Sequence, residues 1–446
     1  MTLAENNASS RKSQERRRRI FRLIAFPLIV ALIIVLEMKE AQVYKLETCE
    51  LKTSAPSESM FMKPMYGAVL RLTGLKGSPQ VVSLGIDEDL QFLQTNVCPA
   101  RSFTADLLKT IAAQGPALIA IDKYYTQAVC SKDDSDADTA ALLSAIASVQ
   151  RPVVLGASTT ESNARTNTSS CLAAVPQLFT SRAGGPAIPP NVHMGLTRLN
   201  ENPLKIPLTW DIFSSNSAGA RLTTADSFAL VAAKLMKPEL NNDPKFQQLL
   251  KSPQQPYANA SDLPLNTKVS DLLCAAAPGD MQTLWNLSCR KDAPKPDLSG
   301  KIVVVGAESP ADKYSVLGQD VYGYQLQAGY IAALLNGAYL RDISPWVLIP
   351  LMLLYLLAQI LLPYMEIHQH PIWPLWHVKH AVVWETGLFC VTMLLGFFVP
   401  LLFHRFPPVA MLLVIAAVFV PDVLFELWFV MNEEMEQEQA GKELQS

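Results

Sequence analysis

Acidic residues end two of the short apolar runs in this chain of 446 residues. The run from Val81 to Asp87 reads VVSLGID, and the run from Ala117 to Asp122 reads ALIAID. Such runs are typical of buried parallel strands, and open α/β sheets bind ligands at the carboxyl ends of their strands. We expect the two strands to be neighbours, with a polar crevice at their ends that holds the candidate ligand-binding residues Asp87, Arg101, Asp122, Glu308 and Asp312. A second interpretation stays open, in which these acids cap helices or pair with Arg101 to hold the structure together.

Two further polar clusters could bind cations. Acids alternate from Asp133 to Asp138, but an EF-hand counted from Asp134 needs Gly and Glu where Thr139 and Ala145 stand. We interpret this run as the acidic first turn of a helix, with a looser cation site as the alternative. Four histidines could bind a transition metal or belong to a connection at a membrane surface, namely His368, His370, His377 and His380. We expect no metal and no cofactor.

Sequence patterns of catalysis and of nucleic-acid binding are missing. His193 is the only histidine before residue 344, and it stands apart from any G-x-S-x-G nucleophile motif. The chain has neither a P-loop nor a G-x-G-x-x-G motif. Its formal net charge is -3, and no basic stripe interleaved with aromatic residues indicates a nucleic-acid partner. We therefore expect that the protein is not an enzyme and binds no nucleic acid.

Strands and helices must alternate to bring the five candidate residues together. Five further segments continue the pattern, being short apolar runs or stretches with helical spacing: 103–114 (helix), 136–148 (helix), 152–156 (strand), 301–306 (strand) and 322–336 (helix). Alternation of this kind predicts an α/β domain with a mainly parallel sheet covered on both faces. The polar stretches 158–190 and 238–264 are interpreted as long surface excursions.

Four apolar segments are each close to the length that crosses a bilayer as a helix. They predict transmembrane helices at residues 21–38, 346–364, 382–402 and 409–430. Four arginines, Arg16 to Arg19, precede the first segment and favour a cytoplasmic N-terminus at residues 1–20. Residues 40–343 are then a periplasmic domain, and residues 431–446 a cytoplasmic tail. A cleaved signal peptide is the alternative for the first segment, although no small-residue cleavage pattern follows Met38.

Cysteine positions agree with an oxidising compartment for residues 40–343. Six of the seven cysteines fall in this range and one falls in an expected span. An even set outside the cytoplasm favours disulfides, and six cysteines allow fifteen pairings. Cys274 with Cys289 is the pair we favour, because it closes a short loop; free buried thiols are the alternative.

The order of these elements resembles the CHASE type 2 domain, a sensory module found with bacterial cyclases and histidine kinases. The matching segments are Gly85-Ile86-Asp87-Glu88, Pro99-Ala100-Arg101, Ala120-Ile121-Asp122, the strand from Gly300 to Gly306, Asp312, and the helix from Gly323 to Leu335. One span before the domain and three after it also match the family. The sequence departs from the family pattern at Asn96 to Pro99, at Gln327 where a histidine is usual, and at Asn200 to Lys205.

The resemblance implies a sensor in the bacterial inner membrane. Many family members continue into a kinase or cyclase, whereas no nucleotide-binding motif follows the last apolar segment here. We therefore expect a periplasmic domain that detects a ligand or envelope signal and passes it to a separate signalling or envelope protein. The alternative is a structural or scaffold subunit of an envelope complex, and a homo-oligomer stays open.

Overall fold

The computed structural model describes residues 71–72, 78–86, 101–125, 136–157, 159–162, 171–174, 188–199, 208–216, 219–251, 263–285, 287, 289, 296–316, 319–340, 350 and 381–402. The chain divides into two compact units. One unit is Lys45–Arg341, and the other combines Met1–Tyr44 with Asp342–Ser446.

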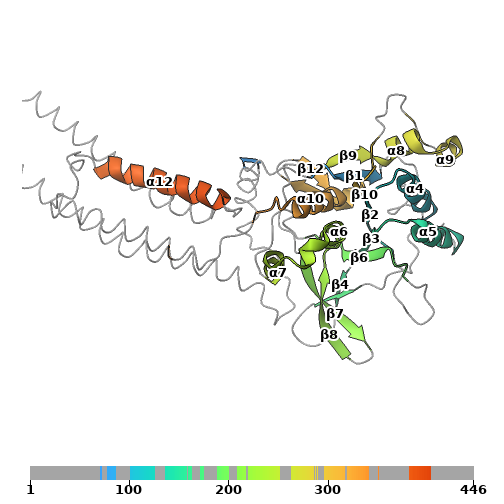
Figure 1. Cartoon of the computed structure of the whole chain (residues 1–446), viewed down its shortest axis with the longest axis horizontal. Helices are drawn as coiled ribbons and strands as arrows, with labels where there is room; N and C mark the ends of the chain where they lie inside the picture. The colour runs from blue at the N-terminus through green and yellow to red at the C-terminus, as the bar shows by residue number, and fades with distance from the viewer. Residues whose placement is uncertain are drawn as a thin grey trace, which may run out of the picture. The chain divides into compact units, whose positions relative to one another are not determined.

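A six-stranded parallel sheet forms the centre of the first unit (Figure 1). Its strands, in spatial order, are β6 (Val192–Leu196), β3 (Val153–Ala157), β2 (Leu118–Tyr124), β10 (Ile302–Ala307), β1 (Val81–Ile86) and β9 (Leu265–Lys268). Every neighbouring pair is parallel. All residues of β1 are buried, as are all but the last of β3 and β10. This explains why these strands are continuous apolar runs rather than alternating ones. The predicted mainly parallel sheet is confirmed.

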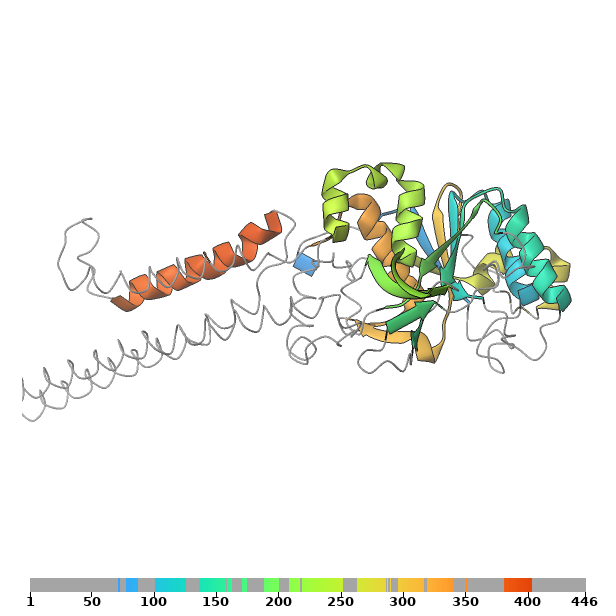
Figure 2. The ribbon, with the colours of Figure 1, turned by 90° about the horizontal axis from the view of Figure 1, so that it is seen from below.

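Helices cover both faces of this sheet (Figures 1 and 2). On one face lie α4 (Arg101–Ala113), α5 (Asp136–Ser148) and α8 (Val269–Ala276), which share one apolar core with alternate residues of the strands. On the other face, α10 (Gly323–Asn336) contacts β10, β1 and β2, and α6 (Phe228–Met236) contacts β6, β3 and α10. The helices and strands expected at 103–114, 136–148, 152–156, 301–306 and 322–336 are therefore confirmed, within two residues at each end.

The two strands that precede the candidate aspartates are not neighbours, contrary to our expectation. β10 lies between β2 and β1, and pairs with both. The sequence IVVVGA of β10 is apolar throughout, and a strand buried on both faces belongs in the middle of a parallel sheet. Because β10 begins at Ile302, far beyond the end of β2 at Tyr124, the order of consecutive elements in the sequence did not indicate this pairing.

The two polar stretches interpreted as surface excursions contain regular structure, which corrects that expectation. β4 (Thr159–Ser162) and β5 (Cys171–Ala174) join the hairpin of β7 (Thr209–Asn216) and β8 (Gly219–Asp226) in a four-stranded sheet. The later stretch holds η2 (Pro238–Asn241) and α7 (Pro244–Lys251). Short polar strands carry little periodic signal of their own, because pairing with distant strands decides whether they form.

The remaining described elements of this unit are short. They are α9 (Gly279–Leu284), η3 (Pro310–Asp312) and the hairpin of β11 (Lys313–Val316) with β12 (Gln319–Tyr322), which stands between β10 and α10 in the chain.

The second unit contributes one described helix, α12 (Ala381–Leu402), which coincides with the span expected at 382–402. Several of its apolar side chains are exposed, namely Val391, Leu394, Leu395, Phe398, Val399 and Leu402. Within the part of the chain that the structure describes, no helix meets both the length and the hydropathy needed to cross a membrane. The expected spans 21–38 and 409–430 lie outside the described residues, as do both termini, the four-histidine segment and, apart from residue 350, the span 346–364.

Candidate functional site

Two carboxylates lie close enough at the carboxyl end of the central sheet for the charge of one to act on the other. Alternate residues of β2, Ile119 and Ile121, enter the core shared with α4 and α5. Asp122 follows them on the opposite face, the side on which α10 packs. Asp312 reaches the same region from η3, after β10 has ended, and its charge acts on Asp122. Two residues almost two hundred positions apart are thus brought to one edge.

The first turn of α10 holds the Asp312 carboxylate. Asp312 accepts hydrogen bonds from the Tyr314 hydroxyl and from the Gly323 backbone N–H. A Cβ atom on Gly323 would lie 2.5 Å from Oδ2 of Asp312, so only glycine lets the helix start so close to the carboxylate. The free N–H groups and the dipole at a helix N-terminus stabilise an anion in this position.

The two carboxylates repel each other in a poorly solvated place. Burial raises the pKa of Asp122 well above its ordinary value, and the charge of Asp312 raises it further. Burial also raises the pKa of Asp312, although the bonds from Tyr314 and Gly323 lower it in part. Burial and the neighbouring carboxylates raise the pKa of Tyr314 to about 12. Among the described lysines, arginines and histidines, none forms an ion pair with Asp122 or Asp312. The pair therefore favours a bound proton or an incoming positive charge.

Glu308, which directly follows β10, contacts Tyr324, the residue after Gly323 in α10. The hydroxyl of Tyr324 is 3.1 Å from Glu308 Oε1 and 3.1 Å from Asn266 Oδ1, so its single hydrogen serves one of them at a time. Tyr324 is fully buried against two glycines that face each other across β1 and β10, Gly85 and Gly306. A side chain on either glycine would collide with the tyrosine.

Arg101 belongs to the opposite helical layer. It begins α4, is buried, and donates from Nη1 to the Thr139 hydroxyl of α5 at 2.5 Å. Asp122, Asp312 and Glu308 lie on the α10 side. Asp87, the fifth candidate, lies outside the described residues.

Sequence reasoning did not identify Tyr314, Tyr324 or Gly323 as parts of this site. Their positions follow from the β11–β12 hairpin and from the start of α10. The available signal was the glycines at the ends of apolar runs, since Gly85 and Gly306 each mark a place where another part of the chain comes close to the sheet.

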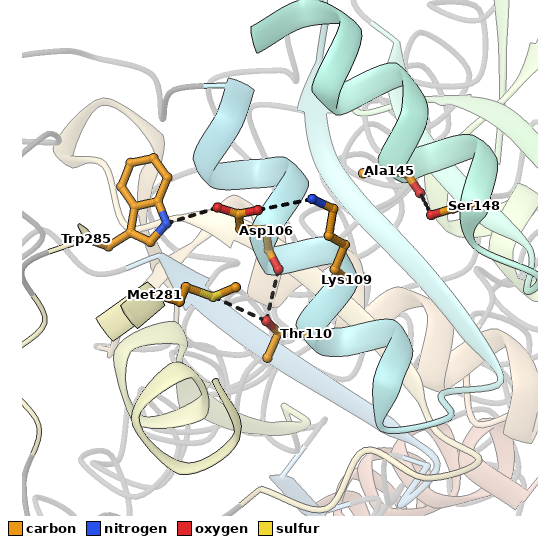
Figure 3. Close-up of polar contacts among 7 residues, drawn as sticks. All are labelled: Asp106, Lys109, Thr110, Ala145, Ser148, Met281 and Trp285. Carbon is orange, nitrogen blue, oxygen red and sulfur yellow. Dashed lines mark hydrogen bonds and ion pairs between the residues drawn. The ribbon is translucent and has the colours of Figure 1, made fainter. Parts of the chain in front are cut away.

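The predicted disulfide between Cys274 and Cys289 is confirmed. It closes a loop of 15 residues whose α9 segment packs against α4 (Figure 3). Trp285 donates from Nε1 to Asp106 Oδ2 at 3.3 Å and meets Phe103 edge-on at 5.0 Å, while Thr110 lies 3.7 Å from the Met281 sulfur. Asp106 also pairs with Lys109, as Figure 3 shows. The disulfide therefore fastens the loop to the helical layer away from the carboxylate pair.

Among the described residues, the carboxylates are not part of a metal-binding cluster. Within the described part of the chain, no three His, Cys, Asp or Glu residues are grouped so that they could hold a metal ion. The acids at the start of α5, Asp136 and Asp138, stand in its first turn, as expected for a helix N-terminus.

Comparison with protein families matches residues 28–365 to the CHASE2 domain. Comparison with curated proteins and with solved structures gives no match. The match covers more than half of the chain, which therefore belongs to the CHASE2 domain family, a family of sensory domains.

Proposed function

We propose that this CHASE2 protein is an inner-membrane sensor whose periplasmic domain detects a cationic small molecule at Asp122 and Asp312. The observation that carries the proposal is the convergence of these two carboxylates with the first turn of α10 at one edge of the sheet. Ligands of open parallel sheets bind at this edge. Membership in a sensory family supports the same reading.

The chemistry of the pair favours a protonated amine as the ligand class. An ammonium group placed between the carboxylates would relieve their mutual repulsion and receive charge-assisted hydrogen bonds. A neutral ligand would leave the repulsion in place, and an anion would increase it.

Helix α10 supplies a route for the signal. Gly323 in its first turn donates to Asp312, and the following residue, Tyr324, contacts Glu308. The helix ends at Asn336, shortly before the span expected at 346–364. A change in the hydrogen bond between Gly323 and Asp312 would move this largely buried helix. We infer that this movement reaches a separate signalling or envelope protein.

Amine binding to the full chain in detergent micelles tests the proposal. Isothermal titration with butylamine and putrescine should give saturable binding that Asp122→Asn and Asp312→Asn each weaken at least tenfold. Asp297→Asn is the matched control, because Asp297 is an exposed acid that precedes β10, at the amino ends of the strands rather than at their carboxyl ends. It should bind as the wild type does.

Two results would contradict the proposal. One is the absence of amine binding to the wild-type chain. The other is binding that all three variants retain equally. Either result would favour the alternative of a structural subunit, which identification of proteins that co-purify with the intact chain would then test.

A further inference from the structure

Among the described strands, β6 is the outermost on one side of the central sheet. β6 pairs with β3 on one side, and on the other side it forms a single bridge, from Leu196 to Ser227, within the described residues. Asn191 accepts from Val153, and Thr197 donates to Ala157, so the odd-numbered residues of β6 point their backbone groups at β3. In a parallel ladder the even-numbered residues then point theirs outward.

Met194 lies at the centre of this edge. The N–H of Val192 is already used, because it donates to Pro189 at 2.9 Å. The bridge at Leu196 closes the other end. The outward backbone groups left between them are the carbonyl of Val192 and both the N–H and the carbonyl of Met194, for which no described strand supplies partners.

A cavity of about 470 Å³ lies along the same edge. Val192 and Met194 line it from the side of the sheet that faces α4 and α5, whereas His193 lines it from the other side. Val231 and Leu235 of α6 form an apolar wall, and the exposed Ile188, which precedes β6 in the chain, also lines the cavity. Residues from both faces of the sheet meet in one cavity only if that cavity wraps around the edge of the strand.

Charge in the cavity is already balanced. Lys234 Nζ and Asp226 Oδ2, which both line it, form an ion pair at 2.6 Å. A charged ligand would have to compete with this pair, and an uncharged one would not.

We propose that the β6 edge binds an extended, uncharged peptide segment of a partner protein, which pairs with Met194 as an additional strand. Main-chain hydrogen bonds would give affinity, and an apolar side chain of the segment would enter the cavity between β6 and α6. An extended peptide fits better than a small molecule, because it offers a donor and an acceptor at strand spacing to the outward groups of one residue. The site is separate from the carboxylate pair and does not depend on the proposed amine sensing.

Backbone substitution tests the proposal directly. The probe is a panel of acetylated, amidated octapeptides that alternate Val, Leu or Ile with Thr or Ser, titrated against the full chain in detergent micelles by fluorescence anisotropy. Met194→Pro removes the outward N–H without touching the bonds to β3, since proline is tolerated at a strand edge of this kind. Met194→Leu is the matched control, because it keeps the N–H and a similar side chain. Met194→Pro should weaken binding at least tenfold, and Met194→Leu less than threefold.

A second arm does not depend on the folding of a variant. The peptide that binds best is resynthesised with N-methyl groups on alternate residues, which blocks the N–H groups along one edge at a time. One of the two methylated peptides should lose binding at least tenfold, and the other should keep it. Equal binding of both, no binding by any peptide of the panel, or equally tight binding of N-acetylvaline amide would overturn the proposal, the last because it indicates a small-molecule pocket.

Discussion

Replacing Asp122 by asparagine should change how the stability of the domain depends on pH. The pKa of Asp122 is raised above its ordinary value of 3.8, first by burial and then by Asp312. In the window between 3.8 and the raised pKa, the folded state therefore binds more protons than the unfolded state. The free energy of unfolding consequently falls as pH rises through this window, by up to about 1.4 kcal/mol per pH unit for each such carboxyl.

Asp312 contributes in the same direction, because burial raises its pKa as well. The wild-type domain should thus lose stability most steeply where both groups titrate. Asp122→Asn removes one of the two, so its slope should be shallower by up to about 1.4 kcal/mol per pH unit. Asparagine resembles the protonated acid in shape and charge. The variant should therefore be at least as stable as the wild type at neutral pH, and this advantage should disappear at about pH 4.

Hydrogen exchange of the full chain in micelles measures this difference. The amides of β2 and β10 are buried at the centre of the sheet, so their slowest exchange reports the opening of the domain. Wild type and variant are compared in steps from about pH 4 to about pH 8, and Asp297→Asn, an exposed acid, should follow the wild type. Identical slopes for wild type and Asp122→Asn would refute the reasoning, and so would a variant that is less stable than the wild type at pH 7.

Three other predictions concern packing, oxidation and topology. Gly306→Ala should destabilise the domain by about 1–3 kcal/mol, because its methyl group would collide with Tyr324 of α10. Gly279→Ala should be nearly neutral, because nothing lies within 4 Å of a Cβ atom at that position. Thermal unfolding of the two variants measures the difference. Cys274→Ala should lower the free energy of unfolding by roughly 3 kcal/mol, since the disulfide joins cysteines that are 15 residues apart. Guanidinium titration measures this loss, and an unchanged unfolding midpoint would contradict a stabilising role of the disulfide. Alkaline phosphatase fused after Leu298 should be active and fused after Ser446 inactive; the reverse pattern would contradict a periplasmic domain.

Local patterns were enough to identify the main elements of the domain. β1, β3 and β10 are apolar runs, and α4 and α5 have helical spacing with clear stops, so short stretches of sequence defined their type and approximate ends. The favoured disulfide followed from the short separation of its cysteines in the chain, since a short loop is easily closed.

Local sequence patterns could not predict which distant segments pair with one another. The insertion of β10 between β1 and β2, and the assembly of β4 and β5 with the later hairpin, depend on contacts between residues far apart in sequence. The face of the sheet on which each candidate residue lies also depends on the tertiary structure. Asp122 and Asp312 share the face of α10, while Arg101, which the sequence grouped with them, is buried against Thr139 on the other face.

The sequence by itself determined that this is an α/β domain with acids at the ends of its strands, because burial and periodicity are properties of short segments. Its resemblance to the CHASE2 family was also visible in the sequence, and the family match bears it out. Only the tertiary structure decided which acids meet. Side chains alternate between the two faces of a strand, so one residue of register decides whether a polar group faces α10 or α4. The close packing of α10 on the sheet also depends on tertiary structure, because it requires glycines of two different strands, Gly85 and Gly306, to lie side by side.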